Sequence, residues 1–218
     1  MWKHVLICLL GVIAFLNADC NVDLYKACQA KLSSSLSIGE DEPWLNTENF
    51  RHQVESYYQY QGQNGMVKVC RAFRDFKNCM QGNYTQCMQA ITFARLGGTT
   101  LSSYQFLGLF NQMHFVCGGG MQIFLSNENC LPNAWSSASG EQINACRYSF
   151  ELRSNADPSS ACVYANQYLT CIETHIKSQC PANDAQFWAC EYARTGIFTK
   201  YPQCNIKCLL PFSGGVIG

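Results

Sequence analysis

Hydrophobic residues along this chain recur at three- and four-residue spacing rather than at every second position. The first clear stripe is Leu24, Cys28 and Leu32, which predicts a helix near residues 22–34. No strand-like alternation of useful length competes, so the expected fold class is all-α, with the stripes packed in a core. Capping residues and the same periodicity predict further helices from Asn46 or Thr47 through Tyr57 and near 66–80, 102–117, 119–126, 140–152, 158–180 and 184–196.

Glycine, proline and polar clusters predict where these helices stop. Segment 33–43 is rich in serine and contains Gly39 and Pro43, so we expect a loop there. Segment 61–65 holds two glycines and should end the second helix, and the glycines at 118–120 should stop the helix before them. The expected architecture is a single disulfide-rich domain of about six to eight helices.

The first eighteen residues have the pattern of a secretory signal peptide. Residues 1–4 are short and positive, and an apolar run of twelve residues follows at 5–16. Twelve residues are too few to cross a bilayer as a helix, which takes about 20, but are typical of a signal-peptide core. We expect cleavage after Ala18, although Leu16 is large for its position; the alternatives are a buried helix or an uncleaved anchor.

The expected mature chain, 19–218, is secreted into the extracellular space. It contains no later apolar run long enough for a transmembrane segment, so we expect it to be soluble.

The charges of the chain also limit which class of partner it can bind. The whole chain has 15 Lys+Arg and 15 Asp+Glu, with 14 % charged residues and zero formal net charge. Such a chain lacks the basic stripe that nucleic acid requires, and nucleic acid is not an expected partner.

Cysteine is the unusual feature of the composition. The chain has 15 cysteines, and loss of Cys8 with the signal peptide leaves an even number, as expected for seven disulfides in an oxidising compartment. Spacing does not determine which cysteines pair. No Cys-x-x-Cys occurs, so neither a metal nor another cofactor is expected. The cysteines expected to be bonded are Cys20, Cys28, Cys70, Cys79, Cys87, Cys117, Cys130, Cys146, Cys162, Cys171, Cys180, Cys190, Cys204 and Cys208.

Two segments, 70–79 and 162–171, share a Cys-x8-Cys frame with an aromatic residue at the seventh position, Phe76 or Tyr168. Nine helical residues turn through about 900° and rise about 13.5 Å, so the two cysteines of each frame face opposite sides. A disulfide needs Cα atoms within about 7 Å. We therefore predict that neither frame closes on itself and that each helix is bonded on both sides to neighbouring segments. The repetition of this frame indicates either that the domain has two similar helical halves or that the match is due to chance.

An enzymatic function would depend on the histidines of the chain. Hydrolytic sites pair a histidine with a nucleophile and a carboxylate, and the mature chain has His52, His114 and His175. We expect His114 beside a core stripe and His175 on the solvent face of its helix. No Gly-x-Ser-x-Gly elbow, His-Glu-x-x-His motif or glycine-rich phosphate loop occurs, so the protein is not expected to be an enzyme.

Cysteine and aromatic spacing over about residues 20–208 carries a family resemblance. It rests on Cys70-Arg71-Ala72-Phe73-Arg74-Asp75-Phe76-Lys77-Asn78-Cys79, on Phe115-Val116-Cys117-Gly118-Gly119-Gly120 with Phe124 and Cys130, and on Tyr168-Leu169-Thr170-Cys171-Ile172 to Gln179-Cys180-Pro181, then Cys190 and Cys204. These stretches resemble the nematode chondroitin proteoglycan 4 domain. A related nematode family of secreted, cysteine-rich helical domains shares the second-half pattern. The resemblance implies a secreted nematode protein, carries over no catalytic residue, and in its better-known member implies attached chondroitin chains.

Chondroitin carriage requires Ser-Gly attachment sites. The chain offers Ser139, expected in a polar loop, and Ser213, near the end, but neither lies in an acidic cluster. Asn83 begins the N-glycosylation sequon Asn83-Tyr84-Thr85, expected in an exposed loop between Cys79 and Cys87. A glycoprotein is therefore expected.

The function predicted from these observations is a secreted, non-enzymatic extracellular protein with a structural or interaction role. Its partner would be an extracellular protein or glycan. Tyr57, Tyr58 and Tyr60 either cover the core or form part of such an interface. The alternatives are a carrier of a small apolar ligand, for which the Phe and Met content is suitable, and a host-facing effector.

Overall fold

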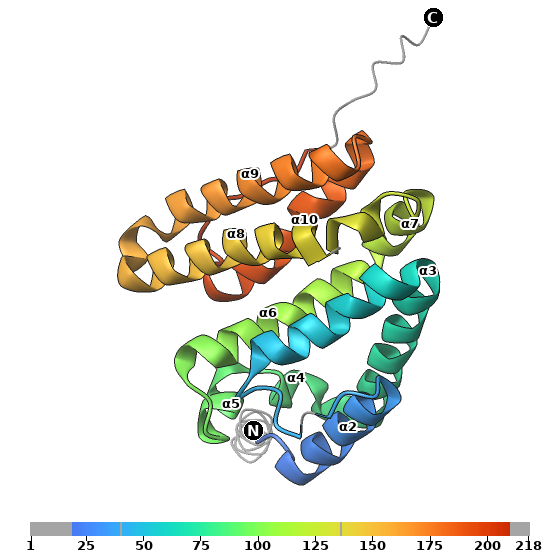
Figure 1. Cartoon of the computed structure of the whole chain (residues 1–218). Helices are drawn as coiled ribbons and strands as arrows, with labels where there is room; N and C mark the ends of the chain where they lie inside the picture. Colours follow the sequence, from blue (N-terminus) through green and yellow to red (C-terminus); the bar gives the residue numbers. More distant parts are fainter. Residues whose placement is uncertain (1–18, 40, 136, 210–218) are drawn as a thin grey trace, which may run out of the picture.

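The computed structural model describes residues 19–39, 41–135 and 137–209, and in these ranges its regular secondary structure is entirely helical. The predicted all-α fold class is confirmed (Figure 1). The predicted signal peptide and Ser213 lie outside the described residues. The α-helices are α2 (Val22–Ser35), α3 (Thr47–Met80), α4 (Tyr84–Cys87), α5 (Ala90–Arg95), α6 (Thr100–Val116), α7 (Gly119–Ser126), α8 (Ser137–Ala156), α9 (Ala161–Gln179) and α10 (Asn183–Lys200), with short 3-10 helices at Gln81–Asn83, Leu131–Trp135 and Pro158–Ser160.

Helix α3 contains a sharp kink at the place where the sequence predicts the end of a helix. Gly62 has φ 49° and ψ −126°, a conformation that a residue without a Cβ adopts at little cost. At Gly65 a Cβ atom would lie 1.9 Å from the Tyr57 carbonyl oxygen, so only glycine fits. The two predicted helices are therefore present, joined by this kink rather than by a loop.

Some helix boundaries differ from those predicted, and two short helices were not predicted. Helix α8 begins at Ser137, so Ser139 lies in its first turn and not in a polar loop. Gly140 does not prevent this, because a single glycine costs a helix only about 1 kcal/mol relative to alanine. The short helices α4 and α5, between residues 80 and 100, were not predicted. Six residues or fewer are too short to establish a helical period.

Seven disulfides pair fourteen cysteines, with Cα–Cα distances from 4.5 to 5.9 Å. As predicted, neither Cys70 with Cys79 nor Cys162 with Cys171 forms a bridge. Among the described residues no bridge joins the part up to Cys117 to the part from Cys130 onward. The first half holds Cys20–Cys87, Cys28–Cys79 and Cys70–Cys117, and the second holds Cys130–Cys180, Cys146–Cys171, Cys162–Cys204 and Cys190–Cys208.

The two halves share one pattern of bridges. In each, six cysteines taken in chain order are joined first to fifth, second to fourth and third to sixth, with Cys190–Cys208 additional in the second half. Helix α2 therefore corresponds to α8, the part of α3 after its kink to α9, and α6 to α10. This correspondence supports two similar helical halves rather than a chance echo. The part of α3 before the kink has no counterpart.

The halves lie one above the other in Figure 1, with the corresponding helices α6 and α10 packed against each other. One continuous hydrophobic core runs through both halves. Trp44, Phe93 and Phe106 pack in the first half, and Trp135 and Trp188 in the second. These large rings belong to an extensive buried core, and the junction between the halves contains the main polar site.

Candidate functional site

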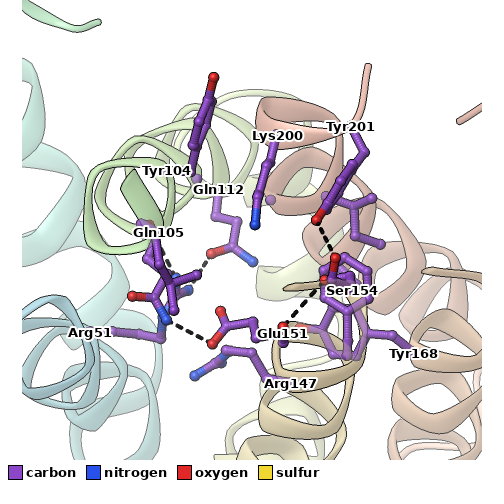
Figure 2. A pocket seen from close by; sticks show the side chains of 16 residues that line it. Arg51, Tyr104, Gln105, Gln112, Arg147, Glu151, Ser154, Tyr168, Lys200 and Tyr201 are labelled. Atoms are coloured by element: carbon purple, nitrogen blue, oxygen red, sulfur yellow. Dashed lines mark hydrogen bonds between the residues drawn. The ribbon is translucent and has the colours of Figure 1, made fainter. Parts of the chain in front are cut away.

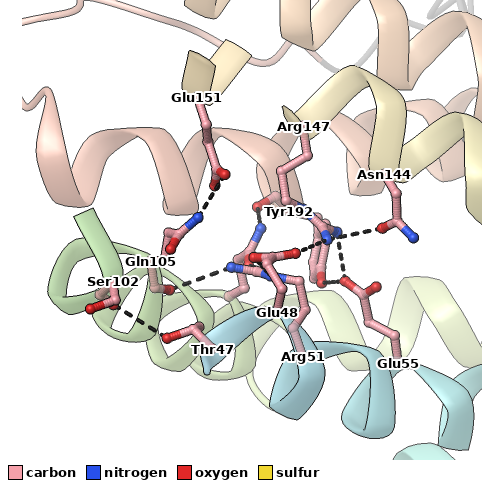
Figure 3. A network of polar contacts seen from close by, with 11 residues as sticks. Thr47, Glu48, Arg51, Glu55, Ser102, Gln105, Asn144, Arg147, Glu151 and Tyr192 are labelled. Carbon is pink, nitrogen blue, oxygen red and sulfur yellow. Dashed lines mark hydrogen bonds and ion pairs between the residues drawn. The ribbon is translucent and has the colours of Figure 1, made fainter. Parts of the chain in front are cut away.

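Helices α3, α8 and α10 converge on a buried ion pair at the junction of the halves (Figure 3). Arg147 is 4 % exposed and Glu55 5 %. The Arg147 Nη2 donates to Glu55 Oε1 at 2.8 Å, and the Tyr192 hydroxyl donates to the same oxygen at 2.5 Å. One carboxylate thus joins the first half to two helices of the second.

A second buried cation, Arg51, extends this network to α6. Its Nη1 donates to Gln112 Oε1, its Nη2 to the Gln105 carbonyl oxygen at 3.4 Å, and its Nε to Glu48 Oε1 at 3.2 Å. The Gln112 side-chain nitrogen donates in turn to the Tyr192 carbonyl oxygen at 3.0 Å. The network therefore connects four helices across the junction.

Electrostatics keep both arginines charged in this buried setting. Burial is the largest influence on Arg147 and disfavours its charge, but Glu55, Glu48 and the neighbouring tyrosines together outweigh burial and raise the pKa of Arg147. The pKa of Glu48 is lowered although burial opposes this, because Arg51 and Arg147 both face its carboxylate. Burial raises the pKa of Glu151, which accepts a hydrogen bond from the Gln105 amide at 2.7 Å. The positive charges of the two arginines are compensated by the neighbouring carboxylates, which fits a network that stabilises the contact between the two halves.

A small cavity lies beside the network (Figure 2). It has a volume of about 50 Å³ and is bordered by Arg51, Arg147 and Glu151 on its polar side and by Tyr104 and Tyr201 elsewhere. This volume is enough for a few water molecules. It is far below the roughly 300–1,000 Å³ of sites that enclose an organic ligand. The cavity therefore does not favour an internal carrier of a lipid-like molecule.

An open groove of about 880 Å³ runs between α8 and α9 above the Cys146–Cys171 bridge. His175 borders it, is only 7 % exposed, and places Nδ1 2.8 Å from Gln142 Oε1. The predicted solvent-facing position of His175 is therefore wrong. His175 follows Cys171 by four residues, so it shares the helix face that the bridge holds against α8.

The N-glycosylation sequon lies in helical turns and not in the open loop predicted for it. Asn83 ends the 3-10 helix Gln81–Asn83 and is half-buried, while Thr85 is exposed in α4. Between them the Tyr84 hydroxyl lies 2.9 Å from His114 Nε2. His114 is half-buried, as its position beside a core stripe predicts.

The three clustered tyrosines have separate environments. Tyr58 is 1 % exposed, and the Tyr57 hydroxyl donates to the Leu36 carbonyl oxygen at 2.5 Å. Tyr60 is 74 % exposed. Two of the three therefore cover the core, and the cluster does not form an aromatic interface.

The buried network was not predicted from the sequence, although a signal was present. Arg51 and Glu55 fall on the same helical stripe as Phe50, Val54 and Tyr58, all of which are buried. Charged residues within an apolar stripe must be paired when the stripe packs, because an isolated buried charge is costly. The pairing partner, Arg147, lies far along the chain, and spacing alone does not identify it.

Within 19–39, 41–135 and 137–209 no group of three or more His, Cys, Asp or Glu side chains is placed to hold a metal ion. Over the same ranges, no helix combines the length and apolar character needed to span a membrane.

Comparison with known proteins found no relative. No family model matches the chain, and neither a curated protein nor a solved structure shows detectable similarity to it.

Proposed function

We propose that the protein is secreted and acts outside the cell as a non-enzymatic structural or interaction protein. The observation that carries the proposal is the pairing of fourteen cysteines in seven bridges that connect the helices to one another and to the segments between them. Disulfides of this density persist in oxidising compartments, and small helices gain stability from them. The predicted signal peptide at 1–18 agrees with this compartment.

The environment of the histidines supports a non-enzymatic role. His114 is paired with the Tyr84 hydroxyl and His175 with the Gln142 amide, which are not the partners of a nucleophile-activating base. The charged groups at the junction are compensated within the protein, as in a structural joint. Neither arrangement favours acid–base or nucleophilic chemistry.

Glycan attachment is the finer part of the proposal. Following the resemblance to the nematode chondroitin proteoglycan 4 domain, we propose chondroitin at Ser139 or Ser213 and an N-glycan at Asn83. Asn83 is the better supported, since its sequon threonine is exposed. Ser139 lies in a helical turn, which gives an attaching enzyme less access to its backbone than an open loop would.

Intact mass of the protein purified from its own tissue tests the proposal. Reduction should add fourteen hydrogen atoms, one for each sulfur of the seven bridges. Removal of N-glycans should lower the mass of the natural protein but not of the Asn83→Gln variant. Chondroitinase-sensitive mass would support the proteoglycan role. A bare mature mass would overturn glycan carriage and leave an interaction protein, and an unprocessed mass with free thiols would overturn secretion.

A further inference from the structure

A second groove lies on the first half, between α3 and the junction of α6 with α7. Its volume is about 580 Å³, and the Cys70–Cys117 bridge lies along it. Phe73 and His114 also border it. This groove is separate from the junction network and from the groove between α8 and α9.

One side of this groove carries three cations spaced three residues apart on α3: Arg71, Arg74 and Lys77. Residues at this spacing lie on neighbouring parts of one helix face, and six residues rise about 9 Å along the axis. Arg71 and Arg74 are exposed, and Lys77 is half-buried. The cations therefore form a row along the groove.

Little negative charge neutralises this row. Arg74 pairs with its neighbour Asp75 at 3.3 Å, but both side chains are more than 60 % exposed, so the pair contributes little. No ion pair of Arg71 or Lys77 occurs among the described residues. The Lys77 ammonium lies 5.9 Å from the Phe73 ring centroid and 5.5 Å from that of Tyr84, contacts that hold it in place without cancelling its charge.

The local excess of positive charge contrasts with the chain as a whole, whose formal net charge is zero. The groove also offers neutral hydrogen-bonding groups, since Asn78 and His114 border it. A row of cations with amide and imidazole groups in a concave surface is complementary to a polyanion rich in hydroxyl groups.

We propose that this groove binds a linear sulfated polysaccharide, whose sulfate and carboxylate groups pair with Arg71, Arg74 and Lys77. The choice of a polysaccharide rests on the proposed extracellular function, because sulfated glycans are the linear polyanions of the extracellular matrix. The proposal concerns non-covalent binding and is independent of any sugar attached to Asn83, Ser139 or Ser213.

A membrane surface fits the groove less well. Proteins that bind anionic lipid at an interface combine cations with projecting aromatic or aliphatic side chains. The large exposed hydrophobic side chains of the described residues lie elsewhere, for example Ile91, Tyr148, Leu152 and Phe198. Val67 and Met121 border the groove but are half-buried, and cations without projecting apolar side chains favour a hydrated, charged chain.

The test is binding of the disulfide-intact protein to immobilised chondroitin sulfate at low and physiological salt. The variant R71E/R74E changes two exposed residues of the row and should weaken binding about tenfold or more, since two attractive contacts become repulsive. The matched control is K31E/K177E, which makes the same change in net charge at exposed lysines of α2 and α9. The control should bind within about twofold of the natural protein.

Each of three results would overturn the proposal: the natural protein fails to bind chondroitin sulfate, R71E/R74E and K31E/K177E lose the same amount of affinity, or R71E/R74E binds as tightly as the natural protein. Duplex DNA and phosphatidylserine vesicles serve as other polyanions. If either binds as tightly as chondroitin sulfate, and R71E/R74E loses the same amount of affinity for it, the groove is a general polyanion site and the polysaccharide assignment is wrong.

Intact mass and circular dichroism of each variant show whether its disulfide bridges and its fold are intact. A purified protein that carries no glycan mass would contradict glycan carriage but leave this binding unaffected.

Discussion

Gly108 of α6 and Gly196 of α10 face each other across the junction of the two halves. A Cβ atom on Gly108 would lie 3.4 Å from the Gly196 carbonyl oxygen and 3.5 Å from its Cα. The two glycines occupy corresponding helices, each ahead of the last cysteine of the shared bridge pattern, Cys117 or Cys204. Their lack of side chains lets the two backbones approach closely, and no disulfide among the described residues supports this contact.

The two glycines should respond differently to alanine. Gly108→Ala adds a Cβ at an ordinary contact distance and gains helix propensity, so stability should stay the same or rise by up to about 1 kcal/mol. Gly196→Ala places a Cβ 3.0 Å from Gln112 Nε2, which is held by the Tyr192 carbonyl oxygen. We expect Gly196→Ala to be about 1–2 kcal/mol less stable than Gly108→Ala in chemical unfolding. Equal stabilities would show that Gln112 moves without cost.

The buried pair of Glu55 and Arg147 should be far more sensitive than a surface pair. Glu55→Gln leaves the buried Arg147 with only the half-exposed Glu48 carboxylate, 3.4 Å away, as counter-charge, and we expect a loss of about 3–5 kcal/mol in the free energy of unfolding. The double variant E55L/R147M removes both charges and should recover most of this loss. Glu42→Gln, which breaks the exposed pair with Lys26, is the control and should cost at most about 1 kcal/mol. A similar cost for Glu42→Gln and Glu55→Gln would contradict the structural role of the network.

The division of the bridges into two sets can be tested by cutting the chain. Glu128 and Asn129 are exposed and lie between Cys117 and Cys130. A protease site inserted between Glu128 and Asn129 should, after cleavage, give two fragments that separate on a denaturing gel without reductant. A site inserted between Gly97 and Gly98 should give fragments that stay together until reduction, because Cys70–Cys117 spans that position. Fragments that remain joined after the first cut would reveal a bridge between the halves.

His114 should make the protein less stable in acid. Burial and the nearby Lys77 ammonium lower the pKa of His114 from its ordinary value of 6.5. As the pH falls through about 6.5 the unfolded chain takes up the proton more readily than the folded one, so the free energy of unfolding decreases. His114→Gln removes this contribution.

Unfolding measured between about pH 7.5 and pH 5 checks the prediction through the difference between natural protein and variant. The difference should shift in favour of His114→Gln as the pH falls. His52→Gln, at an exposed histidine, controls for the loss of a histidine. A relative gain of stability by the natural protein in acid would mean that its protonated His114 is favoured in the folded state.

Hydrophobic spacing and helix geometry predicted correctly those features that depend on residues close together in the sequence. The stripe of Leu24, Cys28 and Leu32 predicts α2 within one residue of its observed end, since an amphipathic face needs no distant partner to be recognised. Helical rotation was likewise sufficient to exclude a Cys70–Cys79 bridge. The sequence failed at His175, whose exposure depends on how α8 packs against α9, and at Ser139, which lies in α8 and not in the expected polar loop.

The sequence by itself determined the helical fold class and the number of cysteines available for bridges, because periodicity and composition are local properties. Tertiary structure alone decided which cysteines pair, that both halves share one pattern of bridges, and that Arg147 meets Glu55. The row of Arg71, Arg74 and Lys77 is visible in the sequence, but its groove exists only when α6 and α7 pack beside α3. These features depend on contacts between residues far apart along the chain, and their geometry follows from how the whole core packs.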